Sequence, residues 1–515
     1  MTFPTLVVAI ILTSAVKRRA RRDGPEDRSS LEVKFPKPKP AHVISHPKPP
    51  STRPGLAIHN TCGAINTGAA RRSPLLATPA LTRLRCLHEC RSGDAKCATY
   101  YIHTTSTMNA VVDAVVVMMV VVMTGAPVSS SPRQGHHQHL PRNTHWTFNL
   151  TTPEIVQGMG YPAEVHHVTT SDGYLLELHR IPHGAAGPSE GRLPVLLQHG
   201  ILGSSADWVL NTADQALAFL LADAGYDVWL SNTRGNTYCR RHQDLSPDQQ
   251  AFWSFSWDEM AYYDLPASID YILEVTGAAD LHYVGYSMGT TIFFAMMSER
   301  PEYNEKVRVM AALAPVAFVD HIKSPLRELA PYSNDIDTVL TLLGVGELLP
   351  GTTVMDYLAE NFCDADIPLV DVCYNIFFLI VGPDTSELNK DYMTSIVSHT
   401  PAGTSVHTAN HYGQEVLSGN FIKYDYGLLG NLNHYGQQTP PHYDLAKVTT
   451  PVGLFHSDND WLAAPEDVAR LQQLLPNVVF SHRVDFHDFN HADFVWAVHA
   501  RQYVHRYVLE LLAQY

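Results

Sequence analysis

Three scarcities narrow what this chain of 515 residues can be. Only three cysteines follow residue 107, basic residues are few in the same part, and no continuous apolar run reaches the ~18–20 residues that a helix needs to span a bilayer. Residues 108–515 contain 19 Lys and Arg against 45 Asp and Glu, a net charge of −26. Because the phosphate backbone of a nucleic acid would repel that charge, we expect no nucleic-acid partner. The shortness of the apolar runs means that we also expect no transmembrane span. A hydrophobic content of 45% excludes a disordered chain and favours a large buried core.

The first 107 residues have a different composition from the rest. They contain 17 Lys and Arg against 6 Asp and Glu, a net charge of +11, and the Pro- and Lys-rich stretch at 35–54 favours an extended conformation with little to pack. Four cysteines follow this stretch, with a spacing that resembles an apple/PAN-like disulfide module or, alternatively, belongs to an irregular segment: Cys62, Cys86, Cys90 and Cys97. We interpret residues 1–107 as an N-terminal extension, or as the product of a gene-model fusion.

Residues 108–131 have the pattern of a cleavable secretory signal. Ala114–Met123 are ten uncharged apolar residues, and small residues follow them. This pattern predicts that the natural chain starts at Met108, whereas the competing interpretation makes Ala114–Met123 a buried helix or strand. Asn149 begins an N-glycosylation sequon, which fits a secreted or lysosomal protein.

In an oxidising compartment, we expect Cys363 and Cys373 to pair, since they lie close enough to close a short loop. Cys239 would then remain free.

Short apolar runs alternate with helical patterns from residue 140 onward. After a predicted hairpin at 163–181, the expected strands are Val195–Gln198, Asp227–Leu230, Leu281–Val284, Val307–Ala312, Val452–Phe455 and Val478–Phe480. The expected helices are Ala213–Ala224, Asp264–Val275, Thr290–Glu299 and Pro465–Leu474. This alternation predicts an α/β fold with a mostly parallel central sheet covered on both faces. The core would comprise residues 140–316 and 441–515, with residues 317–440 inserted as a cap or lid.

The strongest local signal is Gly285-Tyr286-Ser287-Met288-Gly289, which lies between a predicted strand and a predicted helix. A serine at so sharp a turn is held in a strained backbone conformation, and Gly285 and Gly289 let the turn close. The hydroxyl of Ser287 would project above the sheet edge, where the start of the helix offers N–H groups to an oxyanion. The pattern predicts a nucleophile; the alternative is a chance match in a loop.

Such a serine needs a base, and the base needs an acid that orients it. When the chain order is serine, acid, histidine, both partners follow later strands. We favour Asp460 and His491, and the candidates that compete with them are Asp458, Asp467, His482, His487 and His499. The oxyanion would be held by two backbone N–H groups, that of Met288 and that of Ile201 in the loop after an early strand.

Several collinear segments resemble the acid lipases, the family of gastric lipase, lysosomal acid lipase and their insect relatives. The resemblance runs from about residue 149 to the C-terminus, and it is carried by LLQHGILGSSADWVLN (196–211), WLSNTRGNTYCRRH (229–242), VGYSMGTT (284–291), DWLAAPEDV (460–468) and NHADFVWA (490–497). It implies an α/β-hydrolase fold and puts Ser287, Asp460 and His491 on the family's triad. It also implies that Ile201 and Met288 form the oxyanion hole and that Cys363 and Cys373 form a cap disulfide. The family usually has Gln at Met288, but that position acts through its backbone.

The resemblance implies a carboxylic ester hydrolase acting on lipid esters at a lipid–water interface, without cofactor or metal. The histidine cluster at 136, 137 and 139 is interpreted as incidental. Two apolar runs, Leu340–Gly344 and Ile376–Ile380, would suit a lid that faces lipid or, alternatively, the core of the cap. Two rivals are an esterase for soluble esters and a catalytically silent lipase-like carrier or storage protein.

Overall fold

The computed structural model describes residues 147–148, 150–349, 370–384 and 386–515. The extension at 1–107, the signal-like segment at 108–131, the histidines at 136, 137 and 139, and Asn149 lie outside the described residues. The proposed domain boundaries therefore stay predictions. Within the described part, no helix is both long enough and apolar enough to cross a bilayer.

A central sheet organises the described residues. Its strand order is β1-β2-β4-β3-β6-β7-β10-β11, and β5 pairs with β2. Within this order, β4, β3, β6, β7, β10 and β11 run parallel to one another. Strands β1 and β2 form the antiparallel hairpin expected at 163–181, and β2 also pairs antiparallel with β4 and β5. The strand bounds are β1 Glu164–Thr169, β2 Tyr174–Ile181, β3 Pro194–Gln198, β4 Asp227–Leu230, β5 Arg241–His242, β6 Leu281–Tyr286, β7 Val307–Leu313, β10 Val452–His456 and β11 Val478–Arg483. Each predicted strand is thus present, and the α/β fold class is confirmed.

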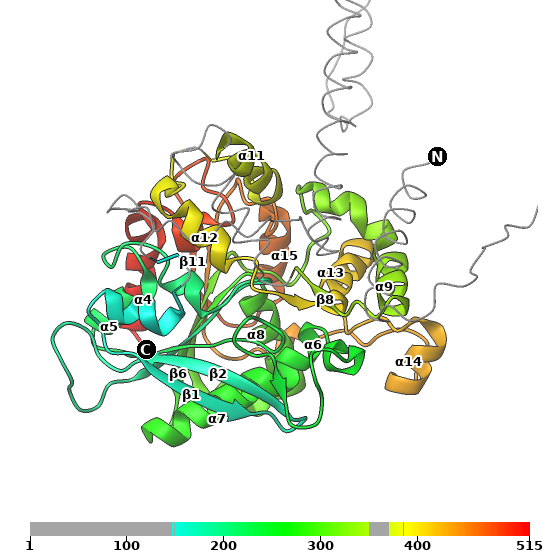
Figure 1. The fold of residues 1–515 in the computed structure, drawn as a ribbon, viewed down its shortest axis with the longest axis horizontal. Helices are drawn as coiled ribbons and strands as arrows, with labels where there is room; N and C mark the ends of the chain where they lie inside the picture. Colours follow the sequence, from blue (N-terminus) through cyan, green and yellow to red (C-terminus); the bar gives the residue numbers. More distant parts are fainter. Residues whose placement is uncertain (1–146, 149, 350–369, 385) are drawn as a thin grey trace, which may run out of the picture. The chain divides into compact units, whose positions relative to one another are not determined.

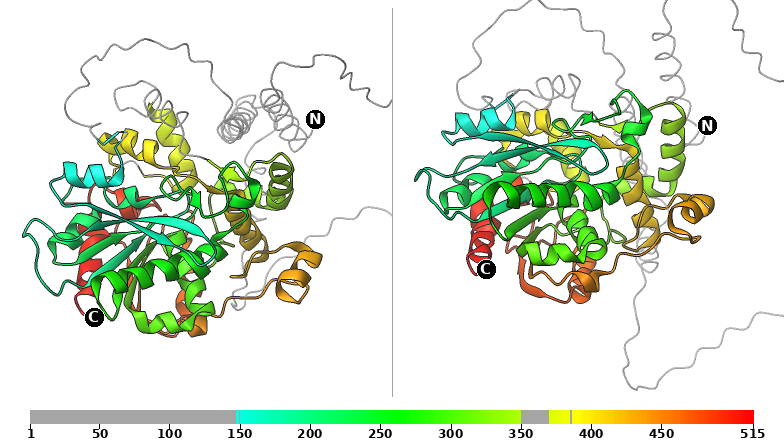
Figure 2. Two further views of the ribbon diagram at one scale, coloured as in Figure 1. Left: turned by 60° about the horizontal axis from the view of Figure 1, so that its bottom comes forward. Right: turned by 90° about the horizontal axis from the view of Figure 1, so that it is seen from below.

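Alternation along each strand builds two cores, one on either face of the sheet. On β3, the side chains of Val195 and Leu197 belong to one apolar cluster, and that of Leu196 belongs to the other. On β10, Phe455 and Leu454 divide in the same way. Because successive side chains of a strand point to opposite faces, such continuous apolar runs need helices on both sides. Figure 2 shows helices on both sides of the sheet.

Each of the four expected helices is present, but the one expected at Ala213–Ala224 is shorter and spans Leu217–Asp223. The bounds of the helices in this layer are α4 Thr152–Gly158, η1 Ser205–Trp208, α5 Leu217–Asp223, η2 Gln250–Trp253, α6 Trp257–Glu259, η3 Met260–Asp264, α7 Leu265–Thr276, α8 Met288–Glu299, η4 Pro301–Lys306, η7 Leu445–Lys447, α15 Pro465–Leu474, α16 Asp493–Trp496, η8 Arg501–His505 and α17 Arg506–Leu512. Helix α7 ends at Gly277, whose φ of 68° provides the left-handed turn that stops the helix.

The inserted segment between β7 and β10 is mainly helical (Figure 1). Its described elements are η5 Pro325–Tyr332, α9 Ser333–Leu342, β8 Glu347–Leu348, α11 Val370–Val381, η6 Lys390–Tyr392, α12 Met393–His399, β9 Thr404–Ser405, α13 Val406–Ser418 and α14 Gly427–Tyr435. Strands β8 and β9 pair with each other and stay apart from the main sheet. The two predicted apolar runs contain both core and surface residues of the cap. Leu340 and Phe378 are buried, as expected for the core, whereas Leu342 is exposed, as expected for a surface that faces lipid.

The parallel strands bring distant loops to one edge. Gln198 at the end of β3 pairs with Gly285 of β6, Tyr286 pairs with Leu313 of β7, and β7 pairs in turn with β10. The loops that begin after these strands therefore meet above the same carboxyl edge. This edge is where a site assembled from residues far apart in sequence is expected.

Candidate active site

Ser287 occupies a sharp turn between β6 and α8. Its φ of 52° and ψ of −118° are unusual for a residue with a side chain, and the strain marks a functional position. The N–H of Ser287 donates to the carbonyl of Leu313 (3.0 Å), and the hydroxyl of Thr290 donates to the carbonyl of Ser287 (2.7 Å). The turn is thus held from the neighbouring strand and from the first turn of the helix.

The two glycines of the motif are sterically required. A Cβ on Gly285 would lie 2.8 Å from the carbonyl oxygen of Gly289, and a Cβ on Gly289 would lie 2.3 Å from the carbonyl oxygen of Gln198. Neither contact is compatible with a methyl group, and in each the obstacle is backbone. The close approach of α8 to β6 therefore depends on Gly285 and its approach to β3 on Gly289, as predicted for a serine on a sharp turn.

Ser287, His491 and Asp460 form one hydrogen-bonded row. Nε2 of His491 lies 2.9 Å from the hydroxyl of Ser287, and Nδ1 lies 2.9 and 2.8 Å from the two carboxylate oxygens of Asp460. All three residues are buried. Because a carboxylate only accepts, Nδ1 carries the proton, which leaves Nε2 free to accept the proton of the Ser287 hydroxyl. The structure thus brings together the three side chains that the sequence favours.

The carboxylate of Asp460 is fixed by the loop that carries it. Its Oδ1 accepts the N–H groups of Leu462 (2.9 Å) and Ala463 (2.8 Å), just before α15 begins. The carbonyl of His491 accepts the hydroxyl of Tyr286 (3.1 Å), so the residue before the nucleophile also holds the base. Donors from the backbone and a neighbouring ring thereby set the orientation of both groups before any substrate is present.

The end of α11 joins the two loops that carry the acid and the base. The carbonyl of Val381 accepts the N–H groups of both Trp461 and His491, each at 3.3 Å. The next residue, Gly382, has a φ of 113°, and a Cβ there would lie 2.4 Å from the carbonyl oxygen of Asn459. The inserted segment therefore contributes backbone to the site as well as covering the sheet. Local patterns gave no signal for this contact.

The loop after β3 presents a fixed peptide to Ser287. Nε2 of His199 accepts the N–H of Thr233 (3.1 Å), so its Nδ1 carries the proton and donates to the carbonyl of Gly200 (2.7 Å). Burial lowers the pKa of His199 to about 4, which keeps the ring neutral. Because the peptide is planar and trans, fixing the Gly200 carbonyl directs the N–H of Ile201 the opposite way.

The backbone N–H groups of Ile201 and Met288 are the two predicted oxyanion donors. A Cβ on Gly200 would lie 3.1 Å from Cβ of Ser287, so the Gly200 backbone packs against the serine. Within the described residues, neither the N–H of Ile201 nor that of Met288 donates to any acceptor. In this part of the chain neither N–H is engaged elsewhere, and their role as the two oxyanion donors stays a prediction.

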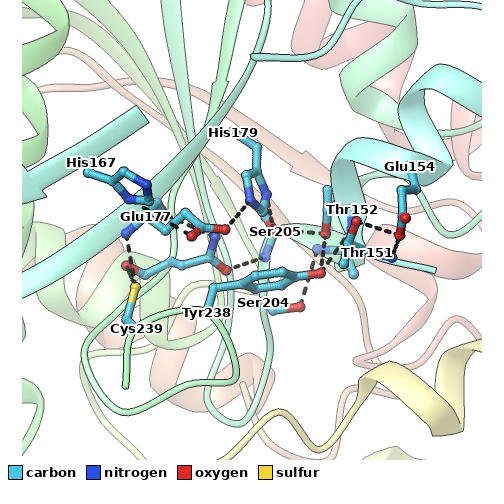
Figure 3. Close-up of polar contacts among 12 residues, drawn as sticks. Thr151, Thr152, Glu154, His167, Glu177, His179, Ser204, Ser205, Tyr238 and Cys239 are labelled. Carbon is cyan, nitrogen blue, oxygen red and sulfur yellow. Dashed lines mark hydrogen bonds and ion pairs between the residues drawn. The ribbon is translucent and has the colours of Figure 1, made fainter. Parts of the chain in front are cut away.

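A buried polar network anchors the same loop from behind (Figure 3). The imidazole of His179 on β2 lies 2.8 Å from the hydroxyl of Ser205 and 2.9 Å from the carboxylate of Glu177. Ser205 in turn donates to Thr152 of α4 (2.9 Å), whose hydroxyl lies 3.0 Å from that of Tyr238. The network ties the loop to a strand, a helix and a further loop, so it restricts where Ile201 lies.

The structure does not bring the competing candidates to Ser287. His487 is 89% exposed and contacts Asp488, while Asp458 pairs with Arg483. The remaining candidates also have other partners: His482 contacts the carbonyl of Tyr503, His499 contacts Glu387, and Asp467 contacts His321. Cys239 is a buried free thiol, as expected. Cys373 is disulfide-bonded, whereas Cys363 lies outside the described residues, so the pairing of these two stays a prediction.

One buried carboxyl near the site was missed from the sequence. Asp207 follows the loop after β3, where a Cβ on Gly203 would lie 2.2 Å from its carboxylate oxygen. Burial raises the pKa of Asp207 to about 7, and its partner is the hydroxyl of Thr400 (3.1 Å). From the sequence alone, an acidic residue between Ala206 and Trp208 is expected at the surface. Only the three-dimensional packing reveals that Asp207 is buried.

Comparison with known proteins places this geometry in a family context. A family model described as a partial alpha/beta-hydrolase lipase region matches residues 152–212, and the alpha/beta hydrolase fold model matches residues 194–498. Lipase lipl-1 of Caenorhabditis elegans is 44% identical over 370 residues, which cover 70% of this chain and 91% of that protein.

Two vertebrate relatives are similarly close. Gastric triacylglycerol lipase of Bos taurus is 42% identical over 71% of this chain and 92% of its own, and the Homo sapiens protein of that name is 40% identical over 73% and 93%. Among solved structures, a thermophilic esterase from Thermogutta terrifontis aligns with 68% of this chain and 98% of its own, at 16% identity and a TM-score of 0.40.

Proposed function

The chain belongs to the acid lipase family of α/β hydrolases, and on that basis we propose that it hydrolyses lipid esters such as triacylglycerols or cholesteryl esters. The observation that carries the proposal is the buried row from Ser287 through His491 to Asp460, with hydrogen bonds of 2.9 and 2.8 Å. This row is the arrangement that activates a serine hydroxyl for acyl transfer.

In the acylation step, Ser287 Oγ attacks the ester carbonyl carbon while its proton moves to Nε2 of His491. The carbonyl oxygen becomes an oxyanion and accepts the N–H groups of Ile201 and Met288. When the tetrahedral adduct collapses, Nε2–H protonates the departing alkoxide, so the alcohol leaves and an acyl ester remains on Ser287. Asp460 keeps the proton of His491 on Nδ1 and stabilises the imidazolium that forms.

Deacylation repeats these steps with water as the nucleophile. A water molecule gives a proton to Nε2 of His491 and attacks the acyl carbon, and the same two N–H groups hold the second oxyanion. Collapse releases the fatty acid and returns the proton to Ser287. The residues supply every proton transfer, and one oxyanion donor typically contributes about 10²–10³-fold to turnover.

We further propose that the protein is secreted or lysosomal. The short apolar segment followed by small residues at 108–131, the sequon at Asn149 and the disulfide at Cys373 support an oxidising compartment. N-terminal sequencing of the mature protein tests this proposal. A mature chain that begins between residues 124 and 131 is expected, and one that retains residues 1–107 contradicts it.

The decisive experiment measures release of fatty acid from an emulsified long-chain triacylglycerol. We expect wild type to release fatty acid and Ser287→Ala to release none above background while keeping its unfolding transition. A matched control is Ser254→Ala, because Ser254 is exposed and makes only a local contact with the Gln250 carbonyl. Equal activity of Ser287→Ala and wild type would refute the assignment.

Two further measurements separate the rivals. A fluorophosphonate probe should label wild type and Ser254→Ala but leave Ser287→Ala unlabelled; absence of label on wild type would indicate a silent carrier. Comparing the emulsion with a short soluble ester distinguishes a lipase from a soluble-ester esterase, which would act on the second substrate alone.

A further inference from the structure

A pocket whose lining does not include Ser287, Asp460 or His491 lies between α6, the π-helical turn η3, the end of α8 and α14. Its volume is about 220 Å³, far more than the roughly 30 Å³ that one water molecule occupies in the liquid. Two tyrosines of η3, Tyr262 and Tyr263, line one part, with ring centroids 4.9 Å apart and planes at 76°. Two tyrosines at the ends of α14, Tyr426 and Tyr435, line another, with centroids 5.9 Å apart.

The polar part of the lining carries an excess of negative charge. Asp258 accepts the N–H of Tyr424 (2.9 Å) and the hydroxyl of Tyr443, and Glu259 accepts the N–H of Ser256 (2.7 Å). Among the described residues, neither carboxylate forms an ion pair with Lys or Arg, although both line the pocket.

The basic groups near the pocket have other carboxylate partners or stay neutral. Arg300 lies 5.7 Å from the Tyr262 ring centroid and pairs with Glu302. Arg234 lies 5.6 Å from the Tyr263 ring centroid and pairs with Asp172 and Asp264. The nearest basic group to Asp258, the imidazole of His411 at 3.9 Å, stays neutral because burial lowers its pKa to about 3. Lys423 also lines the pocket, but its ammonium is paired with Glu299.

Burial dominates the titration of both carboxyl groups. It raises the pKa of Asp258 to about 6, with a smaller contribution from the charge of Glu299, and burial followed by the charge of Asp258 raises the pKa of Glu259. A pocket with aromatic faces and unpaired carboxylates favours an organic cation, because the ring faces attract a cation that is too large and too weakly hydrated for a compact salt bridge.

Helix α14, which contributes to this pocket, also displays apolar side chains to solvent. Leu428, Leu429 and Leu432 are 56%, 74% and 40% exposed, and the helix contains no Asp, Glu, Lys or Arg. In the views of Figures 1 and 2, α14 lies at the periphery of the ribbon, away from the central sheet. Exposed leucines on an uncharged helix mark an interaction surface.

A buried amide holds this helix in place. Asn431 accepts the N–H of Tyr426 (3.0 Å) and donates to the carboxylate of Asp425 (2.7 Å) and to the carbonyl of Gln438 (3.0 Å). The rings of Tyr426 and His434 stack at 3.9 Å. The leucines are therefore presented by a fixed helix that is directly connected to the pocket wall.

The charge of the chain decides which surface suits it. Residues 108–515 carry a net charge of −26, which repels anionic lipids, whereas a zwitterionic choline surface exposes trimethylammonium groups outermost. We propose that the pocket binds the trimethylammonium group of choline lipids while the leucines of α14 enter the acyl layer, so that this end of the molecule docks on zwitterionic lipid surfaces. The proposal rests on the proposed function only in that the substrate is carried by a lipid surface.

The test measures cosedimentation of the full chain carrying Ser287→Ala with vesicles, so that binding is read without hydrolysis. We expect binding to phosphatidylcholine vesicles at least tenfold tighter than to phosphatidylglycerol vesicles. Adding Tyr262→Ala should weaken the phosphatidylcholine binding about three- to thirtyfold, the range expected for one cation–π face, while Tyr262→Phe should retain it. Leu429→Asp should weaken it at least tenfold, whereas Leu474→Asp, at a 48% exposed leucine on α15, should not.

Several results would overturn the proposal. Preference for phosphatidylglycerol, or equal loss with Tyr262→Ala and Tyr262→Phe, contradicts a cation pocket. Saturable binding of choline chloride, together with no effect of Leu429→Asp on vesicle binding, identifies a site for free choline and contradicts docking. The single variant Tyr262→Ala, in which Ser287 is kept, should hydrolyse a soluble ester at the wild-type rate. Failure of the docking proposal is therefore distinguishable from failure of the proposed activity.

Discussion

The row at Ser287 and the pocket beside α14 differ in the partners of their buried carboxylates. Asp460 is fully buried, but backbone N–H groups and the Nδ1 proton of His491 satisfy its carboxylate. Asp258 and Glu259 have only neutral donors and stand beside each other. The first arrangement is fully hydrogen-bonded without a ligand, and it stabilises the charge that develops during a reaction. The second retains an excess of charge, which suits a ligand that brings its own.

The largest effect that separates the two regions should come from neutralising Asp460. Asp460→Asn should lower kcat on a short soluble ester by about 10⁴-fold, because the amide favours the wrong tautomer of His491. Binding of phosphatidylcholine vesicles should not change. The matched control is Asp458→Asn, which removes an exposed ion pair with Arg483 and should leave kcat within about twofold. A small effect of Asp460→Asn, or an equal effect of the two substitutions, would contradict the role of Asp460.

The next largest effect should come from filling the space at the serine turn. In Gly289→Ala, the added methyl group would meet the carbonyl of Gln198, so α8 must move away from β3 and take the N–H of Met288 with it. We expect a loss of about 10²-fold in kcat, since a displacement near 1 Å has that effect. Stopped assays with a soluble ester would measure it, and vesicle binding should again persist.

A suitable control for this change is Gly187→Ala. That position also has a positive φ, 82°, but a Cβ there meets nothing within 4 Å. It should lower the free energy of unfolding by about 1 kcal/mol and leave kcat unchanged. If Gly187→Ala lowered kcat as much as Gly289→Ala, general destabilisation would explain both.

The part of the site that sequence could predict is the part with local signatures. The glycine spacing between a strand and a helix predicts the serine turn. Asp460 and His491 follow apolar strands in the expected order. Val381 and Gly382 have no such signature, because their role is a backbone contact with loops about 80 and 110 positions later. The pocket beside α14 has no local signature for the same reason, because its tyrosines and carboxylates come from separate segments at 258–263, 299 and 426–443. Periodicity reports burial, and it does not report which buried segments meet.

The contact of α11 offers a smaller perturbation of the catalytic side alone. In Gly382→Ala, the methyl group would lie against the carbonyl of Asn459 and 3.3 Å from Cβ of Asn490, between the acid loop and the base loop. We expect kcat to fall about tenfold while KM for a soluble ester stays within about twofold, because the substitution alters the orientation of His491 rather than the substrate pocket. An unchanged kcat would show that the contact does not position the base.

The smallest expected effect concerns stability rather than turnover. It compares how Asp207, near the serine, and Asp258, in the pocket, make the free energy of unfolding depend on pH. Burial raises the pKa of Asp207 to about 7 and that of Asp258 to about 6, whereas both groups titrate near 4 when unfolded. Between these values the native state binds more protons than the unfolded state, so the free energy of unfolding falls as pH rises. Each contribution is fully present below about pH 4 and is lost as pH rises through the folded pKa.

Replacing either group by its neutral isostere should flatten this dependence. Urea unfolding at pH values from 4 to 8 should show that Asp207→Asn removes up to about 4 kcal/mol of the decline and Asp258→Asn up to about 3 kcal/mol. The Asp207→Asn curve should flatten up to about pH 7, and the Asp258→Asn curve only up to about pH 6. Buried Glu415 and Asp493, whose pKa values burial also raises, should maintain the remaining slope in both variants. Curves parallel to wild type would mean that the two carboxyls are ionised in the folded protein throughout this pH range, and that burial does not raise their pKa values.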